Sequence, residues 1–211
     1  MKGLIMQTKK QSRSRASSRS EGSSSLLNRR EAAFLADVPL RAVDKAIEEK
    51  VARPRRARLR GTVLGPDDTV AIAVIAKAGV ALRPSMKKQI RSWTPTFREQ
   101  ISKASELALS DVVVVRPDSS LRKIARSVDR YLEDRERYIE SNPEVRHGEP
   151  VVAGTRLPVH AVAERLRRGD SIGQLAEDYP GVPNRAFETA RIYAEAHPRR
   201  GRPARPWREI R

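Results

Sequence analysis

The stretch His147-Gly-Glu-Pro-Val-Val-Ala-Gly-Thr-Arg-Leu-Pro-Val159 decides how the C-terminal third of this chain folds. Glycine, proline and β-branched residues alternate in it too densely for the interior of a helix. Gly148 and Gly154 can take backbone angles that other residues avoid, whereas Val151 and Val152 favour a strand. Its second proline suits the first turn of a helix. The stretch therefore predicts a tight β element that leads into a helix.

The elements around this stretch follow from the same kind of signal. Short strands are expected at 138–140 and 151–153, and a helix at 158–168 that Gly169 ends. Asp170 or Ser171 caps a further helix, which turns at 179–182 and restarts near Pro183. The result is a helix-turn-helix shape whose outward residues are Asn184, Arg185, Glu188 and Arg191. Such a hairpin serves as a packing or dimer module at least as often as it binds DNA.

The run from Tyr138 to Pro198 resembles a small bacterial family, a domain of unknown function found in antitoxins of the VapB type. The hallmarks of that family are a Gly-x-Pro-Val-x-x-Gly-Thr-Arg-x-Pro-Val core, a glycine that closes the next helix, and a Tyr-Pro-Gly turn. The matching residues are Gly148, Pro150, Val151, Gly154, Thr155, Arg156, Pro158, Val159, Gly169, Tyr179, Pro180 and Gly181.

The resemblance implies the antitoxin of a type II toxin–antitoxin pair, with a cognate PIN-like ribonuclease toxin that uses acidic residues and Mg²⁺. It also implies that Thr155 and Arg156 are structural. We expect Thr155 to cap the turn and Arg156 to pair with a nearby carbonyl or acid.

The segment 199–211 is rich in arginine and proline and cannot bury enough surface to fold alone. Arginine forks pair bidentately with carboxylates, so the segment is expected to wrap the acidic site of the toxin. The toxin-binding candidates are Arg199, Arg200, Arg202, Arg205 and Trp207. A second DNA-binding arm or a free tail remains the alternative.

Residues 26–60 predict an N-terminal helix-turn-helix with an arginine-rich extension. Asn28 is a plausible N-cap with Glu31 three residues later, and a second helix runs from Leu40 to about Val51 after a tight turn. Val38 is expected to fill the corner between the two helices. An ordinary helical hairpin is the alternative.

The same region supplies the expected contacts to DNA. Arg41 and Lys45 face outward on the second helix toward a major groove, although acids on that helix would repel phosphates. The segment 53–60 is expected to be extended and to enter a minor groove or follow phosphates, with a solvated linker as the alternative. The DNA-binding candidates are Arg29, Arg30, Arg41, Lys45, Arg53, Arg55 and Arg56.

The middle region, 61–137, predicts a turn at 61–68 followed by an apolar segment at 70–82, which is expected to be a helix, with a strand as the alternative because of its β-branched residues. This segment is either a homodimer seam or core of its own chain. A basic helix capped by Ser85 is expected to end at Pro95, and a second amphipathic helix to cover 98–109. A strand at 111–116 and a helix from about Leu121 to Arg137, capped by Asp118 or Ser119, complete the region.

Composition limits the protein's class. The chain carries 43 Lys and Arg against 26 Asp and Glu, a net charge of +17, which favours a polyanionic partner such as nucleic acid. Only 38% of residues are hydrophobic and 4% aromatic, so several small modules are expected rather than one large core. Without cysteine or an apolar span, the chain is expected to be cytoplasmic, with no membrane contact and no disulfide. Residues 1–25 are expected to form a disordered basic arm, or else an inert tail.

No pattern predicts catalysis, a metal or a cofactor. The three histidines are scattered, and no phosphate loop or nucleophile elbow is present. His147 and His160 flank the quoted stretch and are expected to be surface or turn residues.

Together these features predict a mainly α fold with short β strands, in which two helix-turn-helix-like modules are joined by a helical middle region and followed by an extended C-terminal tail. The expected function is neutralisation of the toxin and, as a homodimer, binding of operator DNA for autoregulation. A stand-alone regulator or nucleoid protein is the alternative, and an RNA-binding accessory protein is a third.

Overall fold

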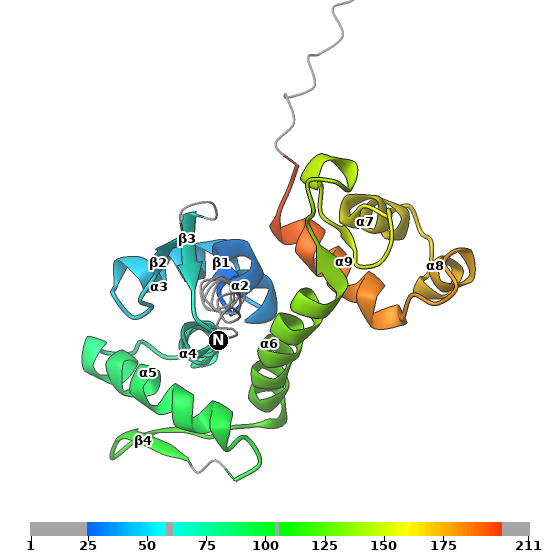
Figure 1. Ribbon diagram of the computed structural model, residues 1–211. Helices are drawn as coiled ribbons and strands as arrows, with labels where there is room; N and C mark the ends of the chain where they lie inside the picture. The colour runs from blue at the N-terminus through cyan, green and yellow to red at the C-terminus, as the bar shows by residue number, and fades with distance from the viewer. Residues whose placement is uncertain (1–24, 58–60, 104–105, 200–211) are drawn as a thin grey trace, which may run out of the picture. The chain divides into compact units, whose positions relative to one another are not determined.

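The computed structural model describes residues 25–57, 61–103 and 106–199. The chain divides into two compact units, the first up to Arg137 and the second from Tyr138 (Figure 1). The fold is mainly helical with short antiparallel strands, as the sequence predicts. The expected arm at 1–25 lies outside the described residues except for its last position.

Unit 1 begins with one strand and two helices, in the order β1 (Leu27–Asn28), α2 (Arg29–Leu35) and α3 (Leu40–Glu48). The predicted capping box is confirmed. The Asn28 side chain accepts from the backbone N–H of Arg30 and Glu31, and the Glu31 carboxylate accepts from the Asn28 N–H at 2.7 Å. These bonds satisfy N–H groups that have no partner inside the helix.

The turn between α2 and α3 is a Schellman motif. The N–H of Val38 donates to the Ala33 carbonyl at 3.0 Å, and that of Asp37 to Phe34 at 3.1 Å. Asp37 takes the left-handed conformation, with φ of 54°. Aspartate tolerates this region better than most residues do, and the turn therefore reverses the chain without a glycine.

The arginine-rich extension is extended at 55–57 as predicted, but it is one strand of a β-hairpin rather than an arm, and the predicted turn at 61–68 was wrong. Strands β2 (Arg55–Ala57) and β3 (Gly61–Leu64) pair antiparallel, and β3 also pairs with β1. The sheet order is β1-β3-β2. Val63 and Leu64 are buried, so their packing stabilises a hairpin that the charge pattern alone hides.

Two longer helices follow in unit 1, α4 (Pro66–Lys77) and α5 (Pro84–Glu99). Residues Val70 to Val74 of α4 are all at least 95% buried within the unit. The helix is therefore core of its own chain, and a dimer seam along these residues is wrong. α5 starts one residue before Ser85 and continues through Pro95, because Ile90 and Phe97 are fully buried on either side of the proline.

The predicted helix at 98–109 is wrong: residues 98–99 end α5, residues 100–103 form a turn, and a strand begins at Leu107. Strand β4 (Leu107–Ser110) pairs antiparallel with β5 (Val113–Val115), the predicted valine strand. Residues 107–110 lie next to a reverse turn, so as a strand they can pair with the strand that follows the turn. As the last turn of a helix they would have no such partner. The predicted last helix of the unit is confirmed as α6 (Ser119–Tyr138), with the Asp118 carboxylate capping Leu121 at 2.7 Å.

A buried polar cluster joins α6 to the start of α2. Glu31 is 1% exposed, and its Oε1 accepts from the Tyr131 hydroxyl at 2.7 Å and from Arg135 Nη1 at 2.8 Å. Arg135 Nη2 also donates to the Leu26 carbonyl at 2.9 Å. Residues of α6 thus hold the start of α2 in place, although Tyr131 lies 100 residues after Glu31 in the chain.

Unit 2 follows the sequence prediction closely. Its elements are β6 (Ile139–Glu140), β7 (Val151–Val152), α7 (Val159–Arg167), α8 (Ile172–Asp178) and α9 (Asn184–Ala196). β6 and β7 pair antiparallel. Gly169 follows α7 with φ of 109°, and Ser171 caps α8. The core lies between α7 and α9 and centres on Val162, Leu175 and Phe187.

Among the described residues, no helix combines the length and the apolar character that a membrane crossing needs.

Candidate nucleic-acid interface

The two faces of α3 differ in chemistry. Val43 and Ala46 are buried and pack against Ala33 of α2, and Val38 packs at the corner as predicted. Arg41 and Lys45 lie one helical turn apart and are exposed. The helix therefore presents a basic stripe on the side away from the core.

The acids on α3 are largely compensated. Arg29 Nη1 lies 2.5 Å from Asp44 Oδ1, which ties α2 to α3. Glu49, directly after the helix, pairs with Lys87 at 2.5 Å and lies 4.0 Å from Lys45. Glu48 is exposed. The repulsion that the sequence predicts between these acids and a phosphate backbone is thus reduced at two of the three positions.

Further predicted DNA-binding residues lie in the β2–β3 hairpin and directly before it, a few residues after α3 in the sequence. The backbone N–H of Arg53 donates to Asp68 Oδ1 at 3.2 Å, and Arg91 Nε pairs with the same oxygen at 3.2 Å. Asp68 thereby anchors the start of the hairpin on α4 and α5. The side chains of Arg53 and Arg55 are exposed, whereas that of Arg56 lies outside the described part of the structure.

Of the predicted DNA-binding residues, Arg30, Arg41, Arg53 and Arg55 have no side-chain partner among the described residues. Arg29 differs, because its guanidinium is engaged by Asp44. Four cations are therefore free to meet phosphates, and a fifth is held by a carboxylate.

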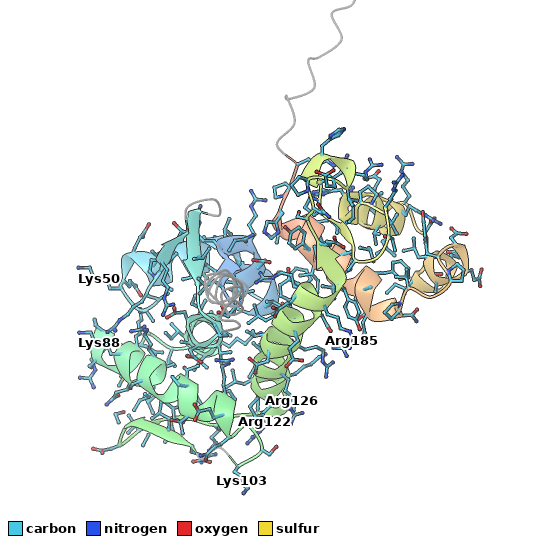
Figure 2. The ribbon with its side chains drawn as sticks, in the orientation of Figure 1. Lys50, Lys88, Lys103, Arg122, Arg126 and Arg185 are labelled. Carbon is cyan, nitrogen blue, oxygen red and sulfur yellow. The ribbon has the colours of Figure 1, made fainter. Side chains whose placement is uncertain are left out.

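Sequence reasoning missed two lysines. Lys50 follows α3 with φ of 57°, and Lys88 lies on α5 next to the partner of Glu49. Figure 2 shows both side chains pointing outward at the same margin of unit 1. The Glu49–Lys87 ion pair brings their two segments together, and only long-range pairing could have revealed this.

The second helical hairpin, α8 to α9, carries fewer free charges. Arg191 pairs with Glu195 at 3.3 Å on its own helix. Asn184, Arg185 and Glu188 are exposed at the start of α9, and Arg185 is labelled in Figure 2. One acid and one base thus share this surface, which makes it less cationic than α3.

The turn of the quoted stretch is stabilised by Thr155. Its hydroxyl donates to the Val152 carbonyl at 2.7 Å and accepts from the Leu157 N–H at 3.0 Å. Gly154 beside it has φ of 73°. The prediction for Thr155 is confirmed. Arg156 is exposed with no partner among the described residues, so its predicted pairing is wrong because its side chain leaves the turn toward solvent.

The first residue of the tail is engaged within unit 2. Arg199 forms an ion pair with Glu149, and the pKa of Glu149 is lowered, chiefly by hydrogen bonding from Arg146 and then from Arg199. The pKa of nearby His160 is lowered by burial and by the positive charge of Arg199. The other predicted toxin-binding residues, Arg200, Arg202, Arg205 and Trp207, lie outside the described residues.

The part of the chain that the structure describes holds no group of three or more His, Cys, Asp or Glu arranged for a metal ion. His147 is exposed in the 3-10 turn Arg146–Gly148.

Comparison with known proteins bears on unit 2. Residues 139–194 match the family described as "Protein of unknown function (DUF433)". An uncharacterized protein, y4eO, of Sinorhizobium fredii is 42% identical over 64 residues, which are 30% of this chain and 29% of that protein. The chain thus matches less than a third of that relative's length. No solved structure matches the chain.

Proposed function

We propose that unit 1 binds duplex DNA, with α3 in the major groove and the β2–β3 hairpin against the adjacent backbone or minor groove. The observation that carries this proposal is the sheet order β1-β3-β2, which joins the hairpin to the helix-turn-helix. A basic hairpin fixed beside a basic helix offers two contact surfaces, and helix-turn-helix proteins place their second helix in the major groove.

The charge distribution supports the same proposal. Arg41 and Lys45 extend from one side of α3, and Arg53 and Arg55 enter the hairpin. Each phosphate that these residues neutralise releases a counterion, so affinity should fall steeply with salt concentration. In this proposal Arg41 and Lys45 reach base edges, whereas the hairpin arginines reach phosphate or a narrow groove.

The test of DNA binding is the salt dependence of the affinity of the full chain for the duplex upstream of its own reading frame. Replacing Arg53 and Arg55 by alanine should weaken specific and unrelated duplexes alike and reduce the salt slope by about 1 to 2. Lys103→Ala, an exposed lysine beyond α5, is the matched control. An unchanged slope in the double variant would rule out the hairpin contact.

We further propose that this DNA-binding protein is the antitoxin of a PIN-like ribonuclease. The motif of residues 148–159 supports this through its resemblance to VapB-type antitoxins, and the arginines from Arg199 onward supply cations for an acidic site. A guanidinium there would replace the charge of the toxin's metal ion. Operator binding would then regulate the operon that encodes both proteins.

Co-expression with the product of the neighbouring reading frame tests the antitoxin proposal. The full chain should co-purify with that product and suppress its Mg²⁺-dependent RNA cleavage. A chain that ends at Pro198 should lose the suppression and keep DNA binding, because unit 1 is unchanged. If the full chain does not associate with the neighbour, a stand-alone DNA-binding regulator becomes the better proposal.

A further inference from the structure

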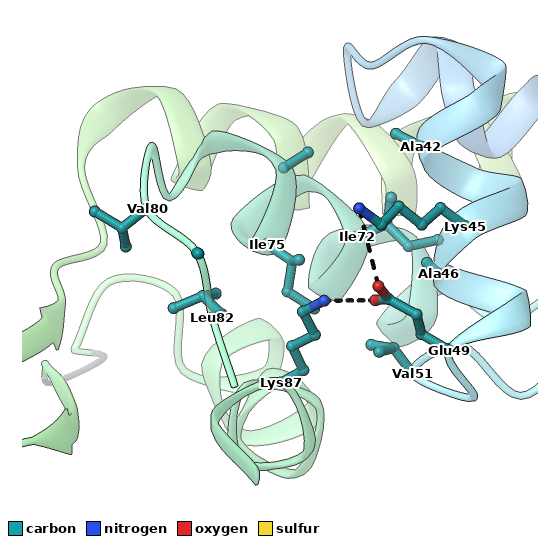
Figure 3. Close-up of a pocket in the computed structure, with 12 residues that line it drawn as sticks. Ala42, Lys45, Ala46, Glu49, Val51, Ile72, Ile75, Val80, Leu82 and Lys87 are labelled. Carbon is teal, nitrogen blue, oxygen red and sulfur yellow. Dashed lines mark hydrogen bonds and ion pairs between the residues drawn. The ribbon is translucent and has the colours of Figure 1, made fainter. Parts of the chain in front are cut away.

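A cavity of about 280 Å³ lies between α3 and α4, and Lys45 of the basic stripe is among its lining residues. Its walls come from α3, α4, α5 and the connection at 80–82 (Figure 3). Nine of its twelve lining residues are aliphatic, among them Ile72, Ile75 and Leu82. Ligand pockets commonly measure roughly 300–1,000 Å³ and have apolar walls with a few polar groups, so this cavity suits a small molecule.

The polar groups of the cavity gather at one side and are mainly cationic. They are Lys45, Glu49 and Lys87, whose charges sum to one positive charge. Lys87 is 15% exposed and lies 2.5 Å from Glu49, so the carboxylate of Glu49 compensates its charge. Lys45 is 72% exposed and lies 4.0 Å from the same carboxylate, which is a weak contact (Figure 3).

We infer that this cavity binds a small monocarboxylate with an aliphatic body, whose carboxylate pairs with Lys45. The aliphatic walls remove the body of such a molecule from water, while Lys45 supplies the charge that Glu49 only partly compensates. An amine of the same length would meet two ammonium groups and one carboxylate that is already paired.

The inferred ligand would act on DNA binding, and this step rests on the proposed function of α3. Lys45 lies on the exposed side of α3 and at the cavity at once, so a carboxylate in the cavity competes with a phosphate for the same ammonium group. Coupling of two ligands is reciprocal. The monocarboxylate therefore releases DNA, and bound DNA weakens the monocarboxylate by the same factor.

The binding step is tested without DNA, by titrating octanoate into the full chain and following the methyl resonances of Ile72 and Ile75. Saturable shifts are expected for octanoate, weaker ones for octanamide and the weakest for octylamine. Lys45→Gln should reduce octanoate affinity about fivefold, as expected for an exposed ion pair, and Lys88→Gln should not change it. Absence of saturable shifts, or tightest binding of octylamine, would overturn the inference.

The coupling is tested with Ala76→Trp, which places a large side chain from an exposed position of α4 at the cavity. This variant should bind the upstream duplex as the unmodified chain does, yet lose both the octanoate shifts and the release of DNA by octanoate. Release that persists in Ala76→Trp would overturn the coupling. Failure of every form to bind DNA would instead count against the proposed function, while the methyl titration still decides whether the cavity binds octanoate.

Discussion

At the scale of single residues, the hydroxyl of Thr155 shows how one atom fixes the turn of the quoted stretch. It donates to Val152 and accepts from Leu157, so it replaces bonds that a strand or helix would otherwise supply. Thr155→Val keeps the shape of the side chain and leaves both partners unsatisfied. We expect a loss of about 1 to 3 kcal/mol in the free energy of unfolding of unit 2, measured by hydrogen exchange of the α7 amides.

Thr155→Ser is the control for this prediction, because it keeps the hydroxyl and removes only a methyl group. It should retain most of the stability. Equal losses in the serine and valine variants would show that the methyl group matters and the hydrogen bonds do not.

His160 gives unit 2 a dependence on pH. Burial first, and then the charge of Arg199, lower the pKa of His160 below its ordinary value of 6.5. The unfolded chain therefore binds the proton first, and stability falls as the pH drops from about 6.5 through the folded pKa. Above that range His160 is neutral in both the folded and the unfolded state, so its contribution to stability does not change with pH.

The prediction is that His160→Gln flattens the decline in the stability of unit 2 between pH 7 and pH 5, again measured by hydrogen exchange. Glu149 acts in a different window, because its lowered pKa makes stability fall only as the pH drops below about 4.5. A decline of equal steepness in His160→Gln would show that another group titrates.

Asp44 sets how much of the basic surface near α3 is available. Its carboxylate pairs with Arg29 and would repel a phosphate group. Asp44→Asn should therefore raise the affinity of the full chain for duplex DNA and increase the salt slope by about 1, as measured by fluorescence anisotropy. Asp111→Asn, an exposed acid in the turn between β4 and β5, should leave both unchanged. Weaker binding by Asp44→Asn would mean that the Arg29–Asp44 pair supports the active shape of the helix pair.

At the scale of elements, local signals predicted what local forces determine. The Asn28 capping box, the α2–α3 turn and the whole element order of unit 2 follow from caps, glycines and apolar spacing within a few residues. The β2–β3 hairpin and strand β4 did not follow. Their stability comes from strand pairing and from buried residues such as Val63, Leu64 and Leu109, which arginine-rich or amphipathic patterns do not reveal.

The candidate site divides in the same way. The sequence predicted that Arg41 and Lys45 face outward, because that depends only on helical periodicity. It did not predict that Asp44 and Glu49 are paired, or that Lys45 also lies at a cavity, since Lys87 is 38 residues from Glu49 in the chain.

The buried ion pair between Glu31 of α2 and Arg135 of α6 should be costly to break from one side. Glu31 and Arg135 are 1% and 6% exposed. Arg135→Met therefore leaves a buried carboxylate whose remaining donors among the described residues are the Tyr131 hydroxyl and the Asn28 N–H. We expect a loss of about 3 to 5 kcal/mol, measured by urea denaturation of the full chain.

The double variant Glu31→Leu with Arg135→Met removes both charges and should be less destabilised than the sum of the two single variants. Simple additivity would show that the two residues stabilise the fold independently, contrary to the hydrogen-bond geometry.

At the scale of the whole molecule, not every cation behind the net charge of +17 is available to a binding partner. Many cations in the described residues are held in ion pairs, such as Arg98 with Asp67 and Asp129, whose pairing raises the pKa of Arg98 against the effect of burial. The unpaired cations beside α3 and in the hairpin are therefore more informative about DNA than the total charge is.

Site-specific photocrosslinking distinguishes α3 from α9 as the helix that reads DNA. A photoreactive benzophenone amino acid is placed at Arg41 or at Arg185 in the full chain, which is then irradiated with the upstream duplex. We expect a DNA adduct from position 41 and none from position 185. An adduct from position 185 alone would instead assign DNA reading to the helical hairpin of unit 2.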